Sequence, residues 1–498
     1  GASSGMAMAH WEIQGWMILI LGWVFVPFYT RSMVYTMPEF LERRYNPQSR
    51  TILSVISLVS YVLTKVAVTV YAGGLVFQQV FGIKELWGID FFWIAAIGLV
   101  VLTALYTIFG GMKSVLYTSV LQTPILLLGS LIILVLGFKE LGGWDEMMRV
   151  CGAVTVNDYG DTMTNLIRSN DDANFPWLGA LIGSAIIGFW YWCTDQFIVQ
   201  RVLSGKNEME ARRGTIFGAY LKLLPVFLFL IPGMIAFALH QKYIGAGGEG
   251  FLPMLANGTA NADAAFPTLV AKLLPVGVKG LVVCGILAAL MSSLASLFNS
   301  SAMLFTIDFY KRFRPETPEK KLVGIGQVAT VVIVILGILW IPIMRSVGDV
   351  LYTYLQDVQS VLAPGIAAAF LLGICWKRTS AQGGMWGLIA GMVIGLTRLG
   401  AKVYYSNAGE VADSTFKYLF YDMNWLFFCG WMFLFCIIVV IVVSLATKAP
   451  TAEKIQGLVF GTATKEQKAA TRASWNHWDI IHTVIILAIT GAFYWYFW

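Results

Sequence analysis

Long apolar runs alternate with short polar segments along most of the chain. A helix that crosses a membrane needs about 20 apolar residues, because each residue rises about 1.5 Å through a hydrocarbon layer of about 30 Å. Twelve runs come close to this length, and the first ten residues look like the end of a further, interrupted helix. The predicted spans are Gln14–Tyr29, Thr51–Val80, Asp90–Phe109, Val115–Phe138, Trp177–Ile198, Thr215–His240, Leu281–Phe305, Leu322–Ile343, Val350–Trp376, Gly384–Val403, Trp425–Thr447 and Ile480–Trp498.

The loops between these spans differ in positive charge. Alternate loops form two sets, of which one carries 21 Lys and Arg residues and the other ten. The richer set comprises Arg31–Arg50, Lys113, Arg201–Arg213, Lys311–Lys321, Lys377–Arg378 and Lys448–Arg472. Short basic loops stay in the cytoplasm, so this set is predicted inside and the C-terminus outside. Within the first of these loops, Met37–Arg44 predicts a short amphipathic helix at the cytoplasmic interface.

The composition agrees with an all-α polytopic membrane protein. Charged residues make up 12% of the chain, about half the share in soluble proteins, and 58% of residues are hydrophobic. The net charge of +6 is spread over many loops, which argues against nucleic acid as a partner. Five of the six cysteines lie in or beside apolar runs, so neither a disulfide framework nor a zinc site is expected. The chain opens at Gly1 without a basic leader, and we interpret it as N-terminally truncated.

A carboxylate and an amide, Asp195 and Gln196, follow a run of four aromatic residues, Phe189–Trp192, inside a predicted span. Burying Asp195 in lipid would cost about 2.5–3.5 kcal/mol, so such a residue normally faces a bundle interior or a wet cavity. Aromatic faces beside polar groups suit an amphipathic ligand. The alternative is a kinked helix whose polar groups satisfy one another.

Three further polar residues lie in or just before other spans: Glu12, Lys222 and Gln356. A common cavity near the membrane midplane would give all of them polar partners. The alternatives are an interfacial position for Glu12 and a Lys222 side chain that reaches back to the cytoplasmic interface. A carboxylate, an ammonium group and amides beside Trp and Tyr together favour an uncharged, polyhydroxylated ligand such as a sugar.

Small hydroxylated residues recur in the segment Ala289–Ser301. Ser292, Ser296 and Asn299 fall on one helical face, with Ser293 and Ser300 beside it. Such a face either packs closely against another helix or supplies oxygen ligands to a sodium ion. The sequence leaves both interpretations open.

Taken together, these segments resemble the sodium/solute symporters, and in particular the sodium/glucose and bacterial sodium/galactose cotransporters. The motifs that carry the resemblance are Trp190–Arg201, Leu203–Asn207, Tyr106–Met112, Tyr220–Pro225, Ser292–Ser300 and Phe370–Arg378. They occur in the family's order over most of the chain. The resemblance implies a LeuT-type fold of two five-helix inverted repeats, residues 1–138 and 177–376, with additional helices in 384–498, and transport by alternating access.

The resemblance also implies roles for particular residues. Hydrogen bonds to the sugar are expected from Glu12, Lys222 and Gln356. Tyr191 is expected to stack on the sugar as the inner gate, with Trp192 and Gln196 beside it. The remaining expected residues are the outer-gate aromatics Trp11 and Tyr352 and the sodium ligands Ala289 (carbonyl), Ser292 and Ser293 (hydroxyls).

The chain departs from the family pattern at three places. Gly188 stands where relatives have an amide or hydroxyl that contacts sugar, and Gly15 stands where the galactose transporter has a serine. Ser119 replaces an aspartate that many relatives link to a second sodium, and Ala295 stands where some have threonine. The first two departures leave the substrate open, and the third predicts one sodium ion per cycle.

The expected protein is therefore a transporter with sodium, a small sugar and membrane lipid as its partners. An inositol or a sialic acid is the alternative solute, and a sugar sensor or channel built on the same fold is the alternative class. An enzyme is not expected, because the chain has no HExxH motif and no paired histidines within its spans. Short, cysteine-poor outer loops favour a bacterial inner membrane.

Overall fold

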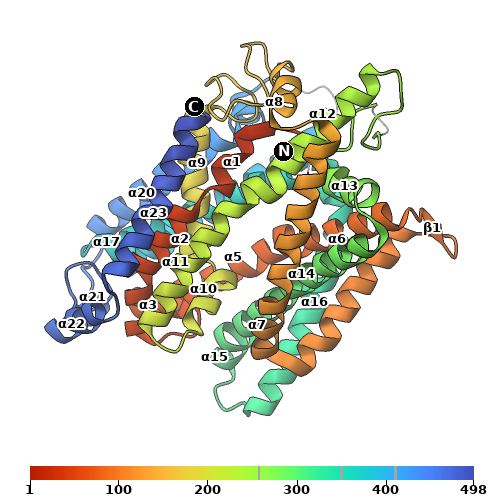
Figure 1. Ribbon diagram of the computed structural model, residues 1–498. Coiled ribbons are helices and arrows are strands. Elements are labelled where there is room, and N and C mark those ends of the chain that lie inside the picture. The colour runs from red at the N-terminus through yellow and green to blue at the C-terminus, as the bar shows by residue number, and fades with distance from the viewer. Residues whose placement is uncertain (256–257, 348–350, 409–411) are drawn as a thin grey trace.

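The chain folds almost entirely into helices (Figure 1). This computed structural model describes residues 1–255, 258–347, 351–408 and 412–498. Eleven of the helical stretches among these residues are long and apolar enough to cross a membrane. They are Gly5–Ser32, Pro47–Phe81, Ser119–Leu141, Trp177–Thr194, Glu208–Gly245, Val276–Phe313, Glu319–Ile343, Leu351–Cys375, Ala381–Asn407, Trp425–Ala446 and His477–Tyr496. The polytopic all-α architecture is thus confirmed, and the predicted span at Asp90–Phe109 corresponds to a shorter apolar helix, Phe91–Leu105.

The N-terminal region is one interrupted helix, and the prediction of a separate preceding helix end was wrong. Its pieces are the 3-10 helix η1 (Gly5–Met8), α1 (Ala9–Glu12), α2 (Gly15–Ile20), the π-helix η2 (Leu21–Phe25) and α3 (Val26–Ser32). Ile13 and Gln14 separate α1 from α2 with ψ angles of 16° and 29°. The backbone therefore leaves the helix for two residues only and then continues.

A short helix in the first predicted cytoplasmic loop and a further span follow. The expected short helix is present as α4 (Met37–Arg44), and Thr36 caps it by accepting a hydrogen bond from the Glu39 N–H. The next span consists of α5 (Pro47–Ser60), the π-helix η3 (Tyr61–Val66) and α6 (Ala67–Phe81).

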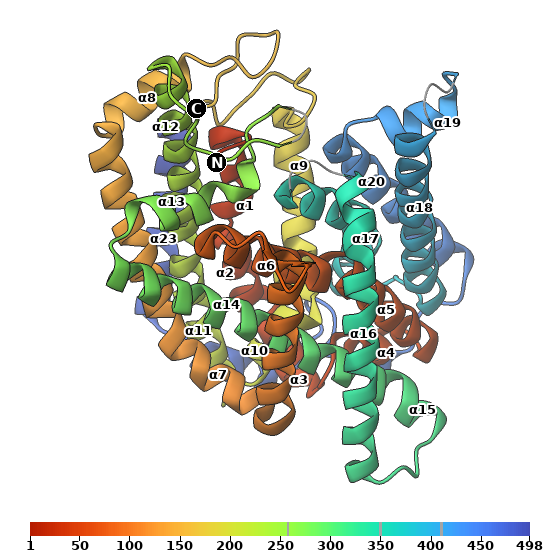
Figure 2. The same cartoon turned by 90° about the vertical axis from the view of Figure 1, so that its right-hand side faces the viewer.

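A hairpin and one very long helix complete the first part of the fold. The hairpin pairs β1 (Glu85–Leu86) with β2 (Ile89–Asp90), and α7 (Phe91–Leu141) then runs for 51 residues. Figures 1 and 2 show α7 bent between its two halves, which correspond to two of the predicted spans. The side chains of Tyr106, residues 108–116 and Thr118 lie outside the described part, and so does most of the Tyr106–Met112 motif.

The span that carries the four consecutive aromatic residues is broken. After α8 (Trp144–Gly152), α9 (Trp177–Gly188) passes into the π-helix η4 (Phe189–Thr194), and Asp195 has an extended backbone before α10 (Gln196–Leu203). The predicted continuous span to Ile198 therefore ends at Thr194. Discontinuous helices of this kind expose backbone and polar groups at membrane depth.

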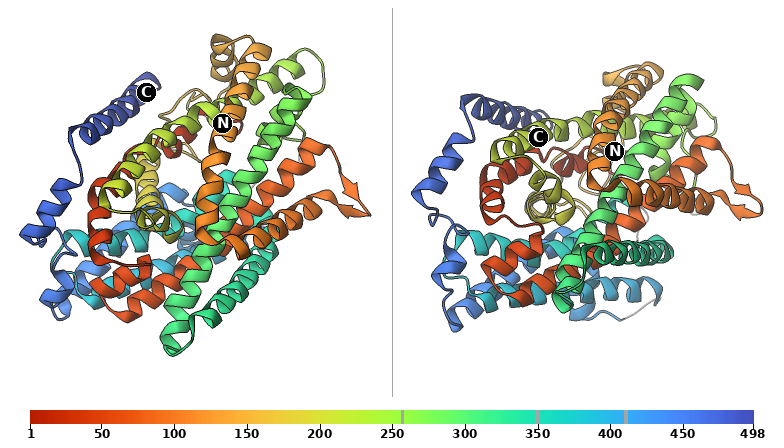
Figure 3. Two further views of the ribbon diagram at one scale, coloured as in Figure 1. Left: turned by 60° about the horizontal axis from the view of Figure 1, so that its bottom comes forward. Right: turned by 90° about the horizontal axis from the view of Figure 1, so that it is seen from below.

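The remaining spans pack around this broken helix (Figures 2 and 3). The elements are α11 (Glu208–Pro225), η5 (Val226–Leu230), α12 (Ile231–Gly245), η6 (Ala262–Ala264), α13 (Ala265–Leu273), α14 (Val276–Met303), η7 (Leu304–Tyr310), α15 (Lys311–Phe313), α16 (Glu319–Val347), α17 (Leu351–Cys375), α18 (Ala381–Asn407), α19 (Thr415–Lys417), η8 (Tyr418–Asp422), α20 (Trp425–Ala446), α21 (Ala452–Ile455), α22 (Lys465–Ala473) and α23 (His477–Tyr496). α17 packs against α9, α18 and α20, and α23 packs against α2 and α11 at the edge of the bundle. α17 is largely buried between its neighbours, whereas α20 and α23 leave many apolar side chains exposed.

The loops gather at two opposite ends of the bundle. Figure 1 shows α8 and the C-terminus at one end and α15, α21 and α22 at the other. These are the two sets of loops that the charge pattern assigned to opposite sides of the membrane. The arrangement agrees with that assignment.

Candidate functional site

A cavity of about 220 Å³ lies between the interruptions of two helices. Its walls come from the α1–α2 interruption, from the junction of α9 and η4, from α11 and from α17. The lining residues are Trp11, Glu12, Gln14, Ile187, Gly188, Tyr191, Trp192, Lys222, Tyr352, Leu355, Gln356 and Gln359. The expected common cavity is therefore present, and seven of the eight predicted substrate and gate residues line it.

A charged pair lies in the cavity wall. Lys222 Nζ is 2.8 Å from Glu12 Oε2, and the Tyr352 hydroxyl donates a 2.5 Å hydrogen bond to Glu12 Oε1. The Lys222 and Glu12 side chains are only 16% and 18% exposed. Lys222 therefore faces inward rather than toward the cytoplasmic interface, and Glu12 is not interfacial.

Aromatic side chains cover both sides of this pair. Trp11 is buried, and its ring stacks on Trp425 at a centroid distance of 5.5 Å and meets Phe175 edge-on at 5.8 Å. Tyr191 and Trp192 meet edge-on at 5.0 Å. Aromatic faces beside a hydrogen-bonding pair provide the two kinds of contact that a polyhydroxylated ring can make.

Two amide groups of α17 also line the cavity. Gln356 and Gln359 are buried, and Gln356 Oε1 has no hydrogen-bond partner among the described residues. A buried carbonyl oxygen without a donor is unfavourable by about 1–3 kcal/mol. This oxygen is therefore suited to accept a hydrogen bond from a solute.

Asp195 does not face the cavity but pairs with Lys65, a residue that the sequence did not single out. Asp195 Oδ2 is bonded to Lys65 Nζ, and Oδ1 accepts a 2.9 Å hydrogen bond from the Tyr61 hydroxyl and a 3.1 Å bond from the Phe197 N–H. Lys65 Nζ also lies 5.1 Å from the centre of the Tyr191 ring. Asp195 therefore fits the alternative interpretation, in which the polar groups at the helix break bond to protein groups and not to a ligand.

Gln196 also lies away from the cavity. Its Oε1 accepts a 2.8 Å hydrogen bond from the Met37 N–H, and its Nε2 donates to the Tyr35 carbonyl at 3.2 Å. Both ends of the amide are bonded to backbone groups, and Gln196 does not line the cavity. The predicted substrate contact is thus replaced by a contact between α10 and the start of α4.

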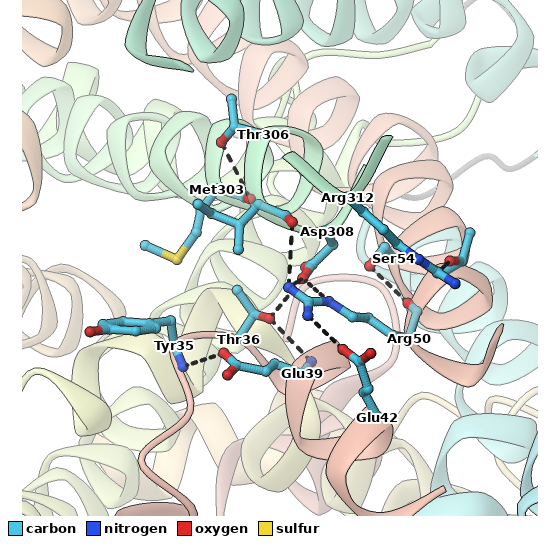
Figure 4. Close-up of polar contacts among 12 residues, drawn as sticks. Tyr35, Thr36, Glu39, Glu42, Arg50, Ser54, Met303, Thr306, Asp308 and Arg312 are labelled. Atoms are coloured by element: carbon cyan, nitrogen blue, oxygen red, sulfur yellow. Dashed lines mark hydrogen bonds and ion pairs between the residues drawn. The ribbon is translucent and has the colours of Figure 1, made fainter. Parts of the chain in front are cut away.

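Figure 4 shows the ion-pair cluster next to this contact. Thr36 Oγ1 donates a 3.1 Å hydrogen bond to Asp308 Oδ1, and Arg50 Nε donates to the same oxygen at 2.6 Å. Arg50 Nη1 reaches Glu42 Oε2 at 2.6 Å. The cluster therefore joins α4 and α5 to η7, at the end of the helix that carries the serine-rich segment.

The predicted sodium ligands Ala289, Ser292 and Ser293 lie on α14, which is uninterrupted there. Ser292 Oγ is 2.6 Å from Ser119 Oγ of α7. No helix break frees the Ala289 carbonyl, so the hydroxyl oxygens are the more accessible ligands for a sodium ion. Sodium accepts such uncharged oxygen ligands.

The other half of the serine-rich face packs against α10. Gln200 Nε2 donates a 2.6 Å hydrogen bond to Ser300 Oγ, and Arg201 is bonded to Ser296 Oγ. Asn299 bonds the Ala295 carbonyl in its own helix at 3.1 Å. Helix packing therefore accounts for residues 296–300, and Ser292 and Ser293 remain as sodium candidates.

The two glycines that differ from the family pattern, Gly15 and Gly188, have different surroundings. A Cβ atom at Gly15 would lie 2.8 Å from the Ala219 carbonyl oxygen, so Gly15 permits close packing of α2 on α11. A Cβ at Gly188 would lie 2.5 Å from Gln14 Oε1 in the cavity wall. Only Gly188 bears on the cavity.

Among solved structures, the chain is similar to a Na⁺-coupled sialic acid symporter in a substrate-bound, outward-open state. The TM-score is 0.68 at 21% identity, over 90% of this chain and 85% of that one. This likeness shows the fold, and the molecule is an integral multi-pass membrane protein with a LeuT-type fold.

The sequence comparisons define the family. The model of the sodium:solute symporter family matches residues 1–391. The chain is 36% identical to a sodium/mannose cotransporter of Bos taurus, over 97% of this chain and 83% of the relative. It is 35% identical to sodium/myo-inositol cotransporter 2 of Homo sapiens, over 93% of this chain and 69% of the relative. The chain belongs to the sodium:solute symporter family, which confirms the predicted resemblance and sodium as the coupling ion. These relatives are transporters and not enzymes.

Proposed function

We propose that this protein imports an uncharged hexose of the glucose or galactose type together with sodium, by alternating access around the described cavity. The observation that carries the proposal is the cavity itself, in which Glu12, Lys222 and Gln356 meet Tyr191 and Trp192. Its volume of about 220 Å³ lies below the roughly 300–1,000 Å³ of sites for drug-sized ligands, which favours a compact solute.

The charge of the cavity supports a neutral solute. Lys222 and Glu12 are the two charged residues among those that line the described cavity, and they neutralise each other at 2.8 Å. An anionic solute such as a sialic acid would need a free cation, whereas a hydroxyl can bond to either member of the pair. Uncharged hydroxylated rings therefore fit the cavity better.

Two aromatic groups act as gates in this proposal. Trp11 and Tyr352 close the outer side, where Trp11 packs on Phe175 and Trp425. Tyr191 closes the inner side, between the solute and the Lys65–Asp195 ion pair. Release into the cell then requires the Tyr191 ring to move.

Sodium couples to the solute through the serine-rich helix. We assign the ion to the hydroxyl groups of Ser292 and Ser293 and to the second lone pair of the Ala289 carbonyl, which stays available within the helix, with Ser119 beside them on α7. The bound ion stabilises the outward-open form and raises the affinity for solute, and the solute must raise the affinity for sodium by the same factor. Residues 1–138 and 177–376 are the two halves that move against each other, 384–498 supply additional helices, and the protein resides in a bacterial inner membrane.

Uptake of labelled solutes into proteoliposomes tests the proposal. Glucose, galactose and mannose are each offered with an inward sodium or potassium gradient. We expect uptake that requires sodium and falls at least tenfold in Gln356→Ala and Lys222→Ala. Lys468→Ala, at an exposed position on α22, is the matched control and should transport normally.

The other outcomes are equally specific. Sodium-dependent binding without uptake would point to a sensor, and a flux that does not saturate with sugar would point to a channel. Equal uptake with potassium would contradict sodium coupling. Transport of myo-inositol in place of hexoses would favour the second candidate, which the myo-inositol relative supports.

A further inference from the structure

Gln14 occupies a special position in the cavity wall. It is the second of the two residues that interrupt the helix between α1 and α2, and it is buried. Its side chain lines the cavity beside Glu12 and opposite the junction of α9 and η4. The family resemblance assigned this residue no role.

The orientation of the Gln14 amide follows from one hydrogen bond. Nε2 donates to the Ser184 carbonyl at 2.8 Å. A carbonyl oxygen can only accept, so the nitrogen must face Ser184 and the Oε1 atom must face the other way. In the part of the chain that the structure describes, no protein donor is bonded to this oxygen.

Gly188 provides the space that the amide fills. A Cβ at position 188 would lie 2.5 Å from Gln14 Oε1 and 3.0 Å from Cδ. Gly188 ends a regular α-helix, so its backbone angles do not require glycine. A side chain at 188 would displace the Gln14 amide, because the two cannot occupy the same space.

We propose that Gln14 is a specificity-determining residue, whose Oε1 accepts a hydrogen bond from one hydroxyl of the transported solute. Gly188 admits the amide to the cavity wall, so the polar contact comes from the first interrupted helix rather than from α9. This inference rests on the proposed function, because it requires a hydroxylated solute in the described cavity.

The proposal has a specific consequence for selectivity. An acceptor held in place by Ser184 stays unpaired when the solute lacks the matching hydroxyl. The loss of such a bond lowers affinity by about tenfold or more. The loss of affinity that follows removal of any other hydroxyl of the solute should be the same with and without Gln14.

The test measures transport of a solute and its monodeoxy analogues by the full chain in proteoliposomes. The probes are D-glucose, D-galactose and D-mannose with their deoxy forms, and the hexose that the wild type takes up best serves as the parent. The wild type should discriminate at least tenfold, in kcat/KM, against one deoxy analogue. Gln14→Met keeps the length of the side chain and removes its amide group. In this variant, uptake of the parent hexose should fall about tenfold, and the discrimination against that deoxy analogue should disappear.

A second set of variants tests the packing. Gly188→Ala should displace the amide and reproduce the selectivity of Gln14→Met. In a Gln14→Ala background the added methyl group has room, so Gly188→Ala should change uptake by less than about twofold there. This cycle remains informative even where Gly188→Ala alone yields little folded protein, because the double variant should restore the yield.

The failures are distinguishable. Absence of sodium-dependent uptake of every hexose by the wild type would overturn the proposed function and this inference with it. Normal wild-type uptake, combined with an equal fall for all analogues in Gln14→Met, would overturn the role of Gln14 alone. Independent effects of the two substitutions would refute the packing relationship between Gln14 and Gly188.

Discussion

Lys65 and Asp195 form a buried ion pair beside the ring of Tyr191, with side chains only 9% and 2% exposed. Lys65 comes from the π-helix η3, and Asp195 lies at the break that follows η4. Tyr61 holds the other oxygen of the carboxylate at 2.9 Å. The pair therefore connects two irregular helical segments on the side of Tyr191 opposite the cavity.

Removal of one partner should destabilise the protein strongly. Asp195→Asn leaves Lys65 charged and buried, and Lys65→Met leaves Asp195 charged and buried. Each should cost about 3–5 kcal/mol, whereas the double variant should cost much less, because no unpaired charge remains. The measurement is the thermal stability of the detergent-solubilised protein. Glu146→Gln, which breaks the exposed pair with Arg149 on α8, is the control and should change little. Additive effects of the two buried substitutions would contradict the coupling.

The hydroxyl of Tyr352 should contribute to solute affinity through Glu12. Tyr352→Phe keeps the ring and removes the hydroxyl, and with it the 2.5 Å hydrogen bond to Glu12. A hydrogen bond to a charged group is worth about 1.5–3 kcal/mol, so we expect solute affinity to fall roughly 10- to 150-fold. Sodium-dependent binding of labelled hexose measures the change.

A matched control lies two residues away. The Tyr354 hydroxyl bonds Trp340 Nε1 at 2.6 Å and the Leu63 carbonyl at 3.1 Å, and it does not line the cavity. Tyr354→Phe should lower stability and leave affinity within about twofold of the wild type. The same loss of affinity in both variants would argue against the assigned contact.

One sodium ion should be transported per cycle, because Ser119 supplies an uncharged hydroxyl where the family resemblance implies a carboxylate for a second ion. Uptake should saturate with sodium at a Hill slope near one. Ser292→Ala should raise the half-saturating sodium concentration, and Ser296→Ala should not, since Ser296 is engaged by Arg201. A slope near two would contradict the transport of a single sodium ion, and an equal effect of both substitutions would contradict Ser292 as a sodium ligand.

The stability of the folded protein should depend on pH through Asp263, which is bonded to the start of α17. Both carboxylate oxygens accept from the Leu351 N–H, at 3.1 and 3.2 Å. Burial raises the pKa of Asp263 from 3.8 to about 6 and outweighs this hydrogen bond. Between about pH 4 and pH 6 the folded protein keeps a proton that the unfolded chain has lost, so stability falls as pH rises through this window.

Asp263→Asn should remove this dependence. The variant should melt at a higher temperature than the wild type at pH 7.5 and show a smaller advantage at pH 5. Asp171→Asn, at an exposed loop position, should behave as the wild type at both values. An advantage of Asp263→Asn that is constant with pH would exclude the titration of Asp263 as its cause.

The apolar runs predict most of the spans, because membrane depth sets helix length. The interruptions were harder to predict. The turn at Ile13–Gln14 carries no proline or glycine pair, and the π-helical turns depend on packing against distant helices. Glu12, Lys222 and Gln356 were identified because isolated polar groups in apolar runs need a shared cavity.

Sequence patterns could not predict the contacts between residues that are far apart along the chain. Lys65 is also a lone charge in an apolar run, and that signal could have identified it, but nothing local indicates Asp195 as its partner. Gln196 neighbours Asp195 in sequence, yet the break turns it toward Met37. Gln14 is recognised only once Gly188 is seen across from it, since the two are far apart along the chain.

The pairing of Lys222 with Glu12 has an electrical consequence. Because the cavity carries no net charge from these two groups, a neutral solute adds nothing to the charge that crosses the membrane. With one sodium ion per cycle, each turnover moves a single positive charge, which gains about 2.3 kcal/mol from a potential of 100 mV. That energy alone would sustain a roughly 40-fold accumulation of solute without any sodium gradient. Transport should therefore appear as an inward current whose size reports the turnover rate.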